Sequence, residues 1–141
     1  MKRTDLAYVA GIVDGEGCID ITHRTRPGHN FPDFVLRVNV VSTDLWLCQM
    51  LKMGFGGRVG IKSEGTAHRM PCWYWVVERK HAADFLKLII PYMHLKKPQA
   101  ELGIKFQNAR GQHATRHSDE RRAVAEAQRI MLQAMKRNKV S

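Results

Sequence analysis

The chain has 141 residues, of which 44% are hydrophobic and 26% charged, values typical of one globular domain with a core rather than of a disordered chain. Lys and Arg outnumber Asp and Glu by 23 to 13, which gives a formal net charge of +10. This charge favours a polyanionic partner, first nucleic acid and then an anionic membrane, although a basic soluble protein without such a partner has the same balance.

The first predicted element is a helix from about Leu6 to Asp14. Thr4 and Asp5 are suitable N-cap residues for it, since both side chains can accept a backbone N–H. Gly15 and Gly17 follow, and we expect them to let the chain leave the helix in conformations closed to other residues.

The same N-terminal segment, "MKRTDLAYVAGIV", faintly resembles a signal peptide. Its apolar run of about eight residues meets Asp14 and Glu16 where small cleavage-site residues belong, which argues against secretion. No run approaches the roughly 20 apolar residues of a membrane span. We therefore expect an intracellular protein without a membrane partner, in a bacterial or phage cytoplasm or in an organelle.

Two strands follow the first helix. In "CIDITHR", Ile19 and Ile21 alternate with polar residues, which is typical of a half-buried strand. "FVLRVNVV" alternates in the same way, and the Pro- and Gly-rich stretch "RPGHNFPD" forms the loop between the two.

The pattern then repeats. "STDLWLCQMLKM" predicts a helix capped by Ser42, Thr43 or Asp44. "GFGGRVGIK" breaks this helix and opens a third strand, and the loop "SEGTAHRMP" joins it to a fourth, "CWYWVVE".

The rest of the chain is predicted to be helical. "HAADFLKLIIPYM" is an apolar helix that ends near Pro91, and Pro98 suits the first turn of the next. A last helix, "SDERRAVAEAQRIMLQAMKRNK", has a basic outer face and an apolar stripe that we expect to pack on the domain. The stripe consists of Val124, Ala127, Met131, Ala134 and Met135.

The cysteine and histidine patterns support no metal or disulfide site. Cys18, Cys48 and Cys72 form no CxxC pair, so free thiols in a reducing compartment are expected. His113 and His117 have the spacing of two ligands on one helix face, but no second pair accompanies them, which favours a solvated pair.

This order of elements predicts an α+β fold in which helices cover one face of a four-stranded antiparallel sheet. The other face is polar and mostly basic, typical of a ribbon that reads bases in the major groove, although an ordinary solvated sheet face is polar as well. The predicted DNA-binding residues there are Asp20, Thr22, Arg24, Arg37, Asn39, Arg58 and Lys62. Arg26 and Arg69, in the two loops, and Trp75 complete the set. The alternation of the fourth strand leaves open whether Trp73 and Trp75 or Tyr74 and Val76 face the core.

The acidic end of the first helix requires its own explanation. A calcium loop is excluded because its fifth and sixth positions would be Cys18 and Ile19. Ala7, Gly11 and Asp14 form a stripe of small residues that allows a second helix to approach closely. Two copies packed there would bring two Glu16 carboxylates together, an arrangement that can hold divalent metals.

The segment Val9–Gly17, "VAGIVDGEG", resembles the LAGLIDADG motif of homing endonucleases. Four letters are identical and three apolar positions are kept, with Gly15 in place of the alanine and Glu16 in place of the second acid; the identical residues are Ala10, Gly11, Asp14 and Gly17. The resemblance extends in element order from Leu6 to Ala109, including "GFGGRV" and "HLKKPQAELGIKF". Residues 111–141 match less clearly, and we treat 1–141 as one domain with a C-terminal helical extension.

The resemblance implies an αββαββα endonuclease domain of the single-motif class, which works as a homodimer. In this family the last acid of each motif, here Glu16, binds Mg²⁺ over the scissile phosphates with help from the Gly15 carbonyl. Mn²⁺ is expected to substitute for Mg²⁺, and Ca²⁺ to bind without supporting cleavage.

Two further catalytic positions are implied by the resemblance. A basic residue near the phosphate falls in "HLKK", where Lys96 is our choice and Lys97 the alternative. Many relatives place a glutamine at the end of the second strand to order water, whereas this chain offers Ser42 or Thr43. Helix capping explains both hydroxyls better than catalysis does.

The predicted function is therefore a sequence-specific homing endonuclease that cuts both strands of a long pseudopalindromic DNA site. An RNA-splicing maturase, with intron RNA as partner, is one alternative that the family implies. A non-enzymatic DNA-binding regulator is the other, and the presence of Glu16 argues against it.

Overall fold

The computed structural model describes residues 1–25, 27–28, 32–112 and 119–137. Its elements in chain order are α1 (Arg3–Glu16), β1 (Gly17–Arg24), β2 (Asp33–Ser42), α2 (Leu45–Phe55), β3 (Arg58–Ser63), β4 (Cys72–Glu78), α3 (Arg79–Ile89), the 3-10 turn η1 (Ile90–Tyr92), α4 (Lys97–Gln112) and α5 (Asp119–Arg137). The predicted order of elements is confirmed. Residues Arg26, His113 and His117 lie outside the described part of the chain.

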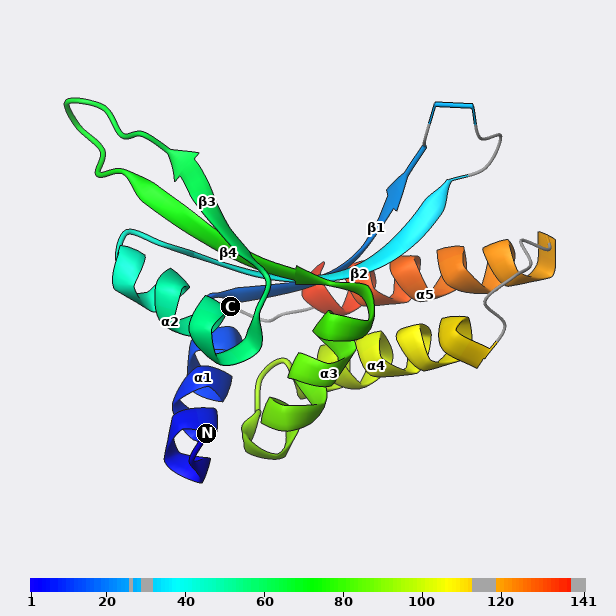
Figure 1. Ribbon diagram of the computed structural model, residues 1–141. Coiled ribbons are helices and arrows are strands. Elements are labelled where there is room, and N and C mark those ends of the chain that lie inside the picture. Colours follow the sequence, from blue (N-terminus) through cyan, green and yellow to red (C-terminus); the bar gives the residue numbers. More distant parts are fainter. Residues whose placement is uncertain (26, 29–31, 113–118, 138–141) are drawn as a thin grey trace.

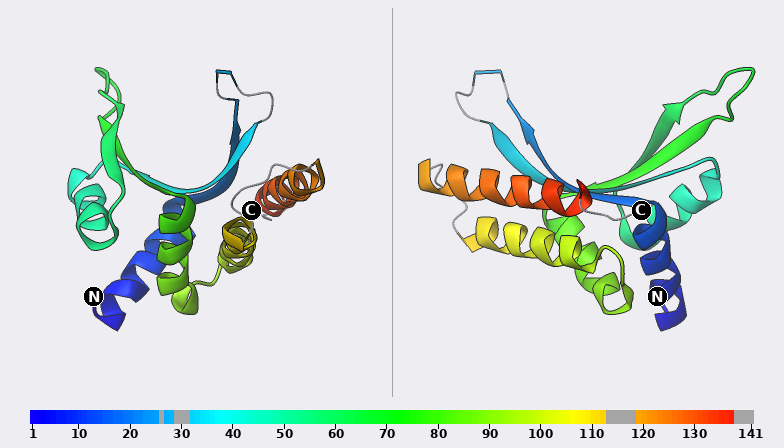
Figure 2. Two further views of the ribbon diagram at one scale, coloured as in Figure 1. Left: turned by 45° about the vertical axis from the view of Figure 1, so that its right-hand side comes forward. Right: turned by 180° about the vertical axis from the view of Figure 1, so that it is seen from behind.

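The four strands form one antiparallel sheet in the order β1-β2-β4-β3. Figures 1 and 2 show the sheet bent into a saddle, with the β1–β2 and β3–β4 hairpins rising as two arms and the helices packed beneath. This arrangement confirms the predicted α+β class, and it leaves the concave upper face of the sheet uncovered by helices.

Alternating side chains divide the sheet into two faces. The lower face carries Ile19, Leu36, Val38 and Val40, which are fully buried against the helices. Trp75 lies on this face too; its ring contacts the Phe85 ring of α3 at a centroid distance of 5.0 Å. The open question about the fourth strand is thereby answered, because Trp73 and Trp75 point to the core and Tyr74 and Val76 to the concave face.

The start of α1 differs from the prediction. The helix begins at Arg3, with Lys2 as N-cap, so Thr4 and Asp5 lie inside the first turn. The Asp5 carboxylate accepts the backbone N–H of Lys2 at 3.2 Å. Asp5 thus binds the free N–H of Lys2 from inside the first turn rather than from the N-cap position. The helix begins three residues earlier than predicted.

Of the two glycines at the end of α1, Gly17 is required, and for a different reason than predicted. Gly15 is helical, and Gly17 has φ −77° and ψ 159°, an extended conformation open to any residue. A Cβ at Gly17, however, would lie 2.8 Å from Val13 Cα and 2.9 Å from the Val13 carbonyl oxygen. The α1–β1 junction therefore requires glycine at position 17 because the backbone approaches the helix so closely.

The predicted packing stripe of α5 is largely wrong. Ala125 and Leu132 are the buried residues of this helix, and Met135 is partly buried. Val124 and Met131 are each about half exposed. The buried residues of α5 therefore lie next to the predicted stripe on the helix surface rather than on it. Contacts with both α4 and the edge strand β1 set this rotation of the helix.

None of the helices in the described ranges combines the length and the apolar character that crossing a membrane requires.

The crowding at Gly17 predicts a clear difference between two neighbouring substitutions. Gly17→Ala should lower the free energy of unfolding by about 1–3 kcal/mol, because its methyl group overlaps backbone atoms of Val13. Gly15→Ala should cause no loss, because in the described part of the chain no atom lies within 4 Å of its added Cβ. Urea denaturation of both variants measures this, and equal stabilities would contradict the close approach.

Candidate nucleic-acid interface

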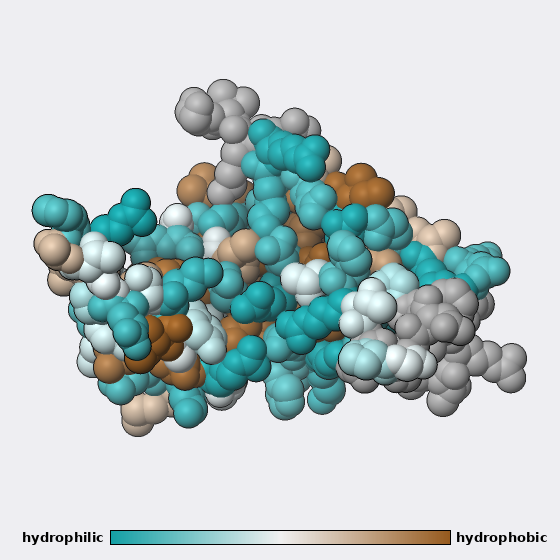
Figure 3. Space-filling model, turned by 90° about the horizontal axis from the view of Figure 1, so that it is seen from above, coloured by the Kyte–Doolittle hydropathy of each residue, from teal (hydrophilic) through white to brown (hydrophobic). Residues whose placement is uncertain are grey.

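The concave face of the sheet carries most of the residues predicted to bind DNA. In the strand register Asp20 lies opposite Arg37, which lies opposite Glu78, so charges of alternating sign form a row across β1, β2 and β4. Figure 3 looks onto this face from above and shows a predominantly hydrophilic surface. The two predicted strand faces are therefore assigned as expected: apolar toward the helices, polar on the open side.

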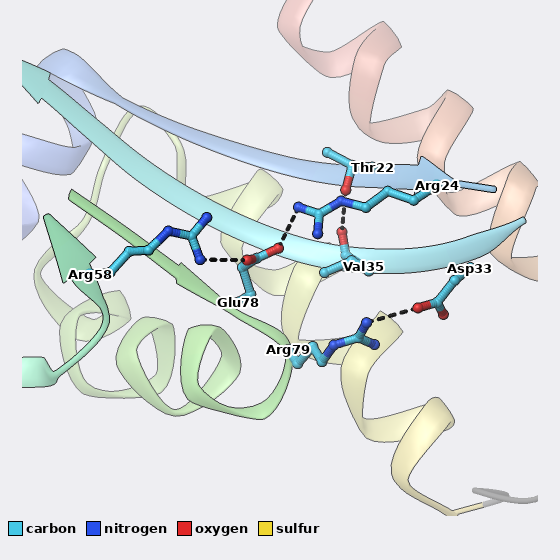
Figure 4. Close-up of polar contacts among 7 residues, drawn as sticks. All are labelled: Thr22, Arg24, Asp33, Val35, Arg58, Glu78 and Arg79. Atoms are coloured by element: carbon cyan, nitrogen blue, oxygen red, sulfur yellow. Dashed lines mark hydrogen bonds and ion pairs between the residues drawn. The ribbon is translucent and has the colours of Figure 1, made fainter. Parts of the chain in front are cut away.

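Two predicted arginines meet at one carboxylate. Glu78, the last residue of β4, accepts a hydrogen bond from Arg24 Nη2 at 2.8 Å, and its other oxygen lies 3.6 Å from Arg58 Nη1 (Figure 4). Arg24 and Arg58 belong to the two edge strands, β1 and β3, and their side chains stay half exposed or more. Glu78 thus joins cations from the opposite edges of the sheet.

Asp20 is held by a residue from the C-terminal helix. Lys136 Nζ lies 2.5 Å from Asp20 Oδ1 and 3.1 Å from Cys18 Sγ, and the Cys18 thiol also donates to Asp20 Oδ2. Burial alone would lower the pKa of Lys136, but the hydrogen bonds to Asp20 and Cys18 outweigh it and raise the pKa above its ordinary value. Burial raises the pKa of the Cys18 thiol. Both shifts favour the protonated forms, so near neutral pH Asp20 contacts the Lys136 ammonium and the Cys18 thiol.

The other predicted DNA contacts occupy varied positions. Thr22 Oγ1 donates to the Val35 carbonyl, and Asn39 is half-buried in the centre of β2. Arg37 is half-buried too, and its Nε is buried without a hydrogen-bond partner among the described residues. Lys62 is exposed at the β3 bulge and Arg69 in the β3–β4 loop.

Trp75 is a wrong prediction. Its side chain is fully buried on the helix side of the sheet, and its indole N–H donates to the Gly56 carbonyl at 2.7 Å. A residue buried on the helix side is closed to DNA. Its role is to fix the α2–β3 connection to the core.

Glu16 is the last residue of α1 and is exposed, as is Gly15 before it. The described part of one chain contains no group of three His, Cys, Asp or Glu side chains able to enclose a metal ion. An exposed carboxylate and a backbone carbonyl are nevertheless oxygen donors of the kind Mg²⁺ prefers, and Mg²⁺ commonly takes one or two carboxylates plus phosphate oxygens. The donors of one chain fit part of a Mg²⁺ site.

The end of α1 is clamped to the segment before α4. The Asp14 carboxylate accepts the backbone N–H groups of His94 at 2.8 Å and Lys96 at 3.0 Å. In return Lys96 Nζ donates to the carbonyls of Val13 at 3.2 Å and Gly17 at 2.5 Å. The Lys96 ammonium sits where the helix dipole is negative, which adds to the stability of this contact. We call these contacts of Asp14 and Lys96 the clamp. They fix the backbone on both sides of Glu16, at Asp14 before it and at Gly17 after it.

This geometry corrects the predicted docking stripe. Ala7 and Gly11 are exposed, and no atom of the described residues lies within 4 Å of a Cβ built at Gly11. Asp14 does not continue this open surface, because its carboxylate is buried inside its own chain. The open part of the stripe therefore consists of Ala7 and Gly11.

Ser42 ends β2 and serves the turn into α2. Its hydroxyl accepts the backbone N–H of Asp44 at 2.9 Å, and Asp44 Oδ1 accepts that of Trp46 at 3.0 Å. Asp44 is therefore the helix cap, one of the three residues predicted for it, and the Ser42 hydroxyl has a structural partner.

Solved structures with the same arrangement decide the fold. The homing endonuclease I-CvuI in complex with its target matches 94% of this chain and 82% of its own, with a TM-score of 0.78 and 18% identity. The archaeal intron-encoded homing endonuclease I-Vdi141I, complexed with DNA, matches 94% and 84%, with a TM-score of 0.75 and 15% identity. This chain has the LAGLIDADG homing endonuclease fold.

The LAGLIDADG homing endonuclease I-SmaMI, bound to cleaved DNA, is similar as well. It matches 84% of this chain but only 47% of its own, with a TM-score of 0.62 and 20% identity. No protein-family model and no curated protein matches the chain. Within the LAGLIDADG fold, α1 carries the motif and the saddle-shaped sheet carries the basic face.

Two residues of this face were missed by sequence reasoning. The alternation of β4 places Glu78 on the same strand face as Tyr74 and Val76, but it does not indicate whether that face is open or buried. Lys136 had no such signal, since it contacts Asp20 across 116 positions of sequence.

The clamp predicts different effects for two adjacent lysines. Lys96→Met keeps most of the side-chain volume but leaves the Val13 and Gly17 carbonyls without their donor, so the free energy of unfolding should fall by about 1–3 kcal/mol. Lys97→Met, at an exposed position, should change it by less than about 0.5 kcal/mol. If urea denaturation gave equal values for the two variants, Lys96 would not be part of the clamp.

Proposed function

We propose that this chain is a homodimeric homing endonuclease that binds a long pseudopalindromic DNA site and cuts both strands with the help of Mg²⁺. The observation that carries the proposal is the exposed Glu16 at the clamped end of α1, within a fold shared with DNA-bound homing endonucleases. The basic concave face beside it supports DNA as the substrate.

The charge and shape of the sheet support binding to duplex DNA. The net charge of +10 attracts a polyanion, and the β1–β2 and β3–β4 hairpins rise as two arms beside the concave face (Figure 2). Arg24 of β1 and Arg58 of β3 have side chains that are half exposed or more. Arg and Lys on a β-ribbon can bond to guanine edges, and Asn to adenine. Arg24, Arg58 and Asn39 are the proposed base contacts, while Lys62 and Arg69, farther out on the arm, are proposed to contact phosphates.

The proposed metal ligands are the Glu16 carboxylate and the Gly15 carbonyl, completed by phosphate oxygens and by the same groups of a second chain. A bound Mg²⁺ would supply an activated water and charge stabilisation at the attacking and leaving oxygens. Mn²⁺ is proposed as a substitute, and Ca²⁺ as an ion that binds without supporting cleavage. Structures of I-CvuI in the presence of Ca and of Mg are consistent with divalent metal use in this fold.

The chain's own residues prepare this site. Asp14 and Lys96 hold the end of α1 rigid, so the Glu16 backbone has one position before DNA arrives. We propose that the Lys96 charge beside Gly17 also offsets negative charge that develops at the scissile phosphate. Ser42 is not needed in this proposal, because accepting the Asp44 N–H in the turn into α2 already gives its hydroxyl a structural role.

A second copy of the chain is proposed to pack against Ala7 and Gly11. Both are small and exposed on α1, so two α1 helices can approach closely and bring their Glu16 residues together. The chain matches only about half of I-SmaMI, which is consistent with two copies doing the work of one longer chain.

Glu16→Gln should abolish cleavage while preserving DNA binding, because the amide keeps the size of the carboxylate but loses its charge. The target is first selected from a randomised DNA library with Mg²⁺ and again with a chelator. Cleavage and gel-shift assays on the selected site then compare the variant with wild type. Equal cleavage rates would remove Glu16 from the mechanism, and a library from which no DNA site is enriched would favour a maturase.

Gly11→Leu should prevent dimerisation without unfolding the protomer. The new side chain meets open space within its own chain but blocks the approach of a second α1. Sedimentation velocity should show a monomer, and circular dichroism should show that the monomer is folded. Ala123→Leu, at an exposed position of α5, is the matched control and should remain dimeric. A tight, active Gly11→Leu dimer would contradict the proposed interface.

A further inference from the structure

We propose that Glu78 is a specificity-determining positioning residue: it sets the two guanidinium groups of Arg24 and Arg58 in the orientation in which they read base edges. The inference rests on the proposed function, since it assumes that the concave face reads DNA. It concerns a residue that need not touch DNA itself.

The first reason is geometric. Arg24 and Arg58 come from β1 and β3, which lie at opposite edges of the sheet and do not pair with each other. The Glu78 carboxylate contacts both, one oxygen for each, at 2.8 and 3.6 Å (Figure 4). One residue of β4 therefore couples the two arms of the saddle through their side chains.

The second reason is the difference in exposure. The Glu78 side chain is 19% exposed, whereas those of Arg24 and Arg58 are 50% and 59% exposed. The carboxylate thus lies below the guanidinium groups, which remain open to the concave side. An arginine that donates one N–H to Glu78 keeps further N–H donors in the same guanidinium plane. Bidentate recognition of guanine requires such a fixed plane.

The third reason is that Glu78 is itself held in place. Arg79, the next residue, has φ +58°, a conformation uncommon for a residue with a side chain. Its guanidinium bonds to Asp33 Oδ2 at 2.8 Å (Figure 4). Arg110 Nη2 lies 3.5 Å from the other oxygen of Asp33. This turn from β4 into α3 is bonded to β2 and α4 immediately after Glu78, so the carboxylate is a fixed anchor for the two more exposed arginine side chains.

Removing the charge of Glu78 should therefore alter which bases are read more than how tightly DNA is held. In Glu78→Gln the guanidinium groups lose their common anchor, and the preference for the selected base over its competitors should fall about tenfold at the positions read by Arg24 and Arg58. Affinity for unrelated DNA should rise, because one negative charge has left the face.

The experiment measures binding of wild-type and variant proteins to the selected site and to all its single-base substitutions, at one fixed salt concentration. Glu64→Gln removes the same charge from an exposed position of the β3–β4 loop and serves as the control. It should raise affinity for all sequences alike and leave the base preferences unchanged. Melting temperatures identify any loss of folding, and Glu78→Asp, which keeps the charge, should retain part of the preference.

A double-mutant cycle separates positioning from direct contact. If Glu78 acts through Arg24, then Glu78→Gln added to Arg24→Ala should cause no further loss of preference at the base read by Arg24. Unchanged preferences in Glu78→Gln, or additive effects in the cycle, would overturn the inference while leaving the endonuclease proposal intact. A wild-type protein with no sequence preference at all would overturn both.

Discussion

The reciprocal contact between Asp14 and Lys96 is the constraint on which the proposed site depends. Asp14 caps two backbone N–H groups of the segment before α4, and Lys96 returns its ammonium to the carbonyls at the end of α1. Loss of the Asp14 carboxylate would leave the backbone N–H groups of His94 and Lys96 without this acceptor, and loss of the Lys96 ammonium would leave the Val13 and Gly17 carbonyls without this donor; either loss is costly. Together Asp14 and Lys96 place Glu16 at a rigid helix end although the residue itself is exposed. A single exposed carboxylate can thus be positioned without contacts of its own.

On the concave face, too, contacts between residues far apart in the sequence hold functional side chains in place. Each of its two central carboxylates, Asp20 and Glu78, is paired with cations from distant parts of the chain. The cations that contact these two carboxylates are therefore held at defined positions on a basic face. For a DNA-binding surface this separates two properties: net charge sets affinity for any duplex, whereas fixed guanidinium planes set the choice of bases.

Sequence patterns predicted the elements well where periodicity decides them, and less well where tertiary contacts do. The fourth strand was predicted with the bounds found, Cys72–Glu78, because its alternation and flanking turns are local signals. The same alternation could not tell which face was buried, so Trp75 was misassigned. The partners of Asp14 and Asp20 lie 80 or more residues away, and no local pattern announces them. The packing face of α5 was missed for a similar reason, since two neighbours decide its rotation.

The central claim is that one chain supplies half of a cleavage site. It is tested most directly with mixed dimers of wild-type and Glu16→Gln chains, purified through two different affinity tags and assayed on a supercoiled plasmid carrying the selected site. We expect that the mixed dimer binds the site but does not produce linear DNA at the wild-type rate. Linear product at that rate from the mixed dimer would contradict the claim, because one Glu16 would then suffice for both strands.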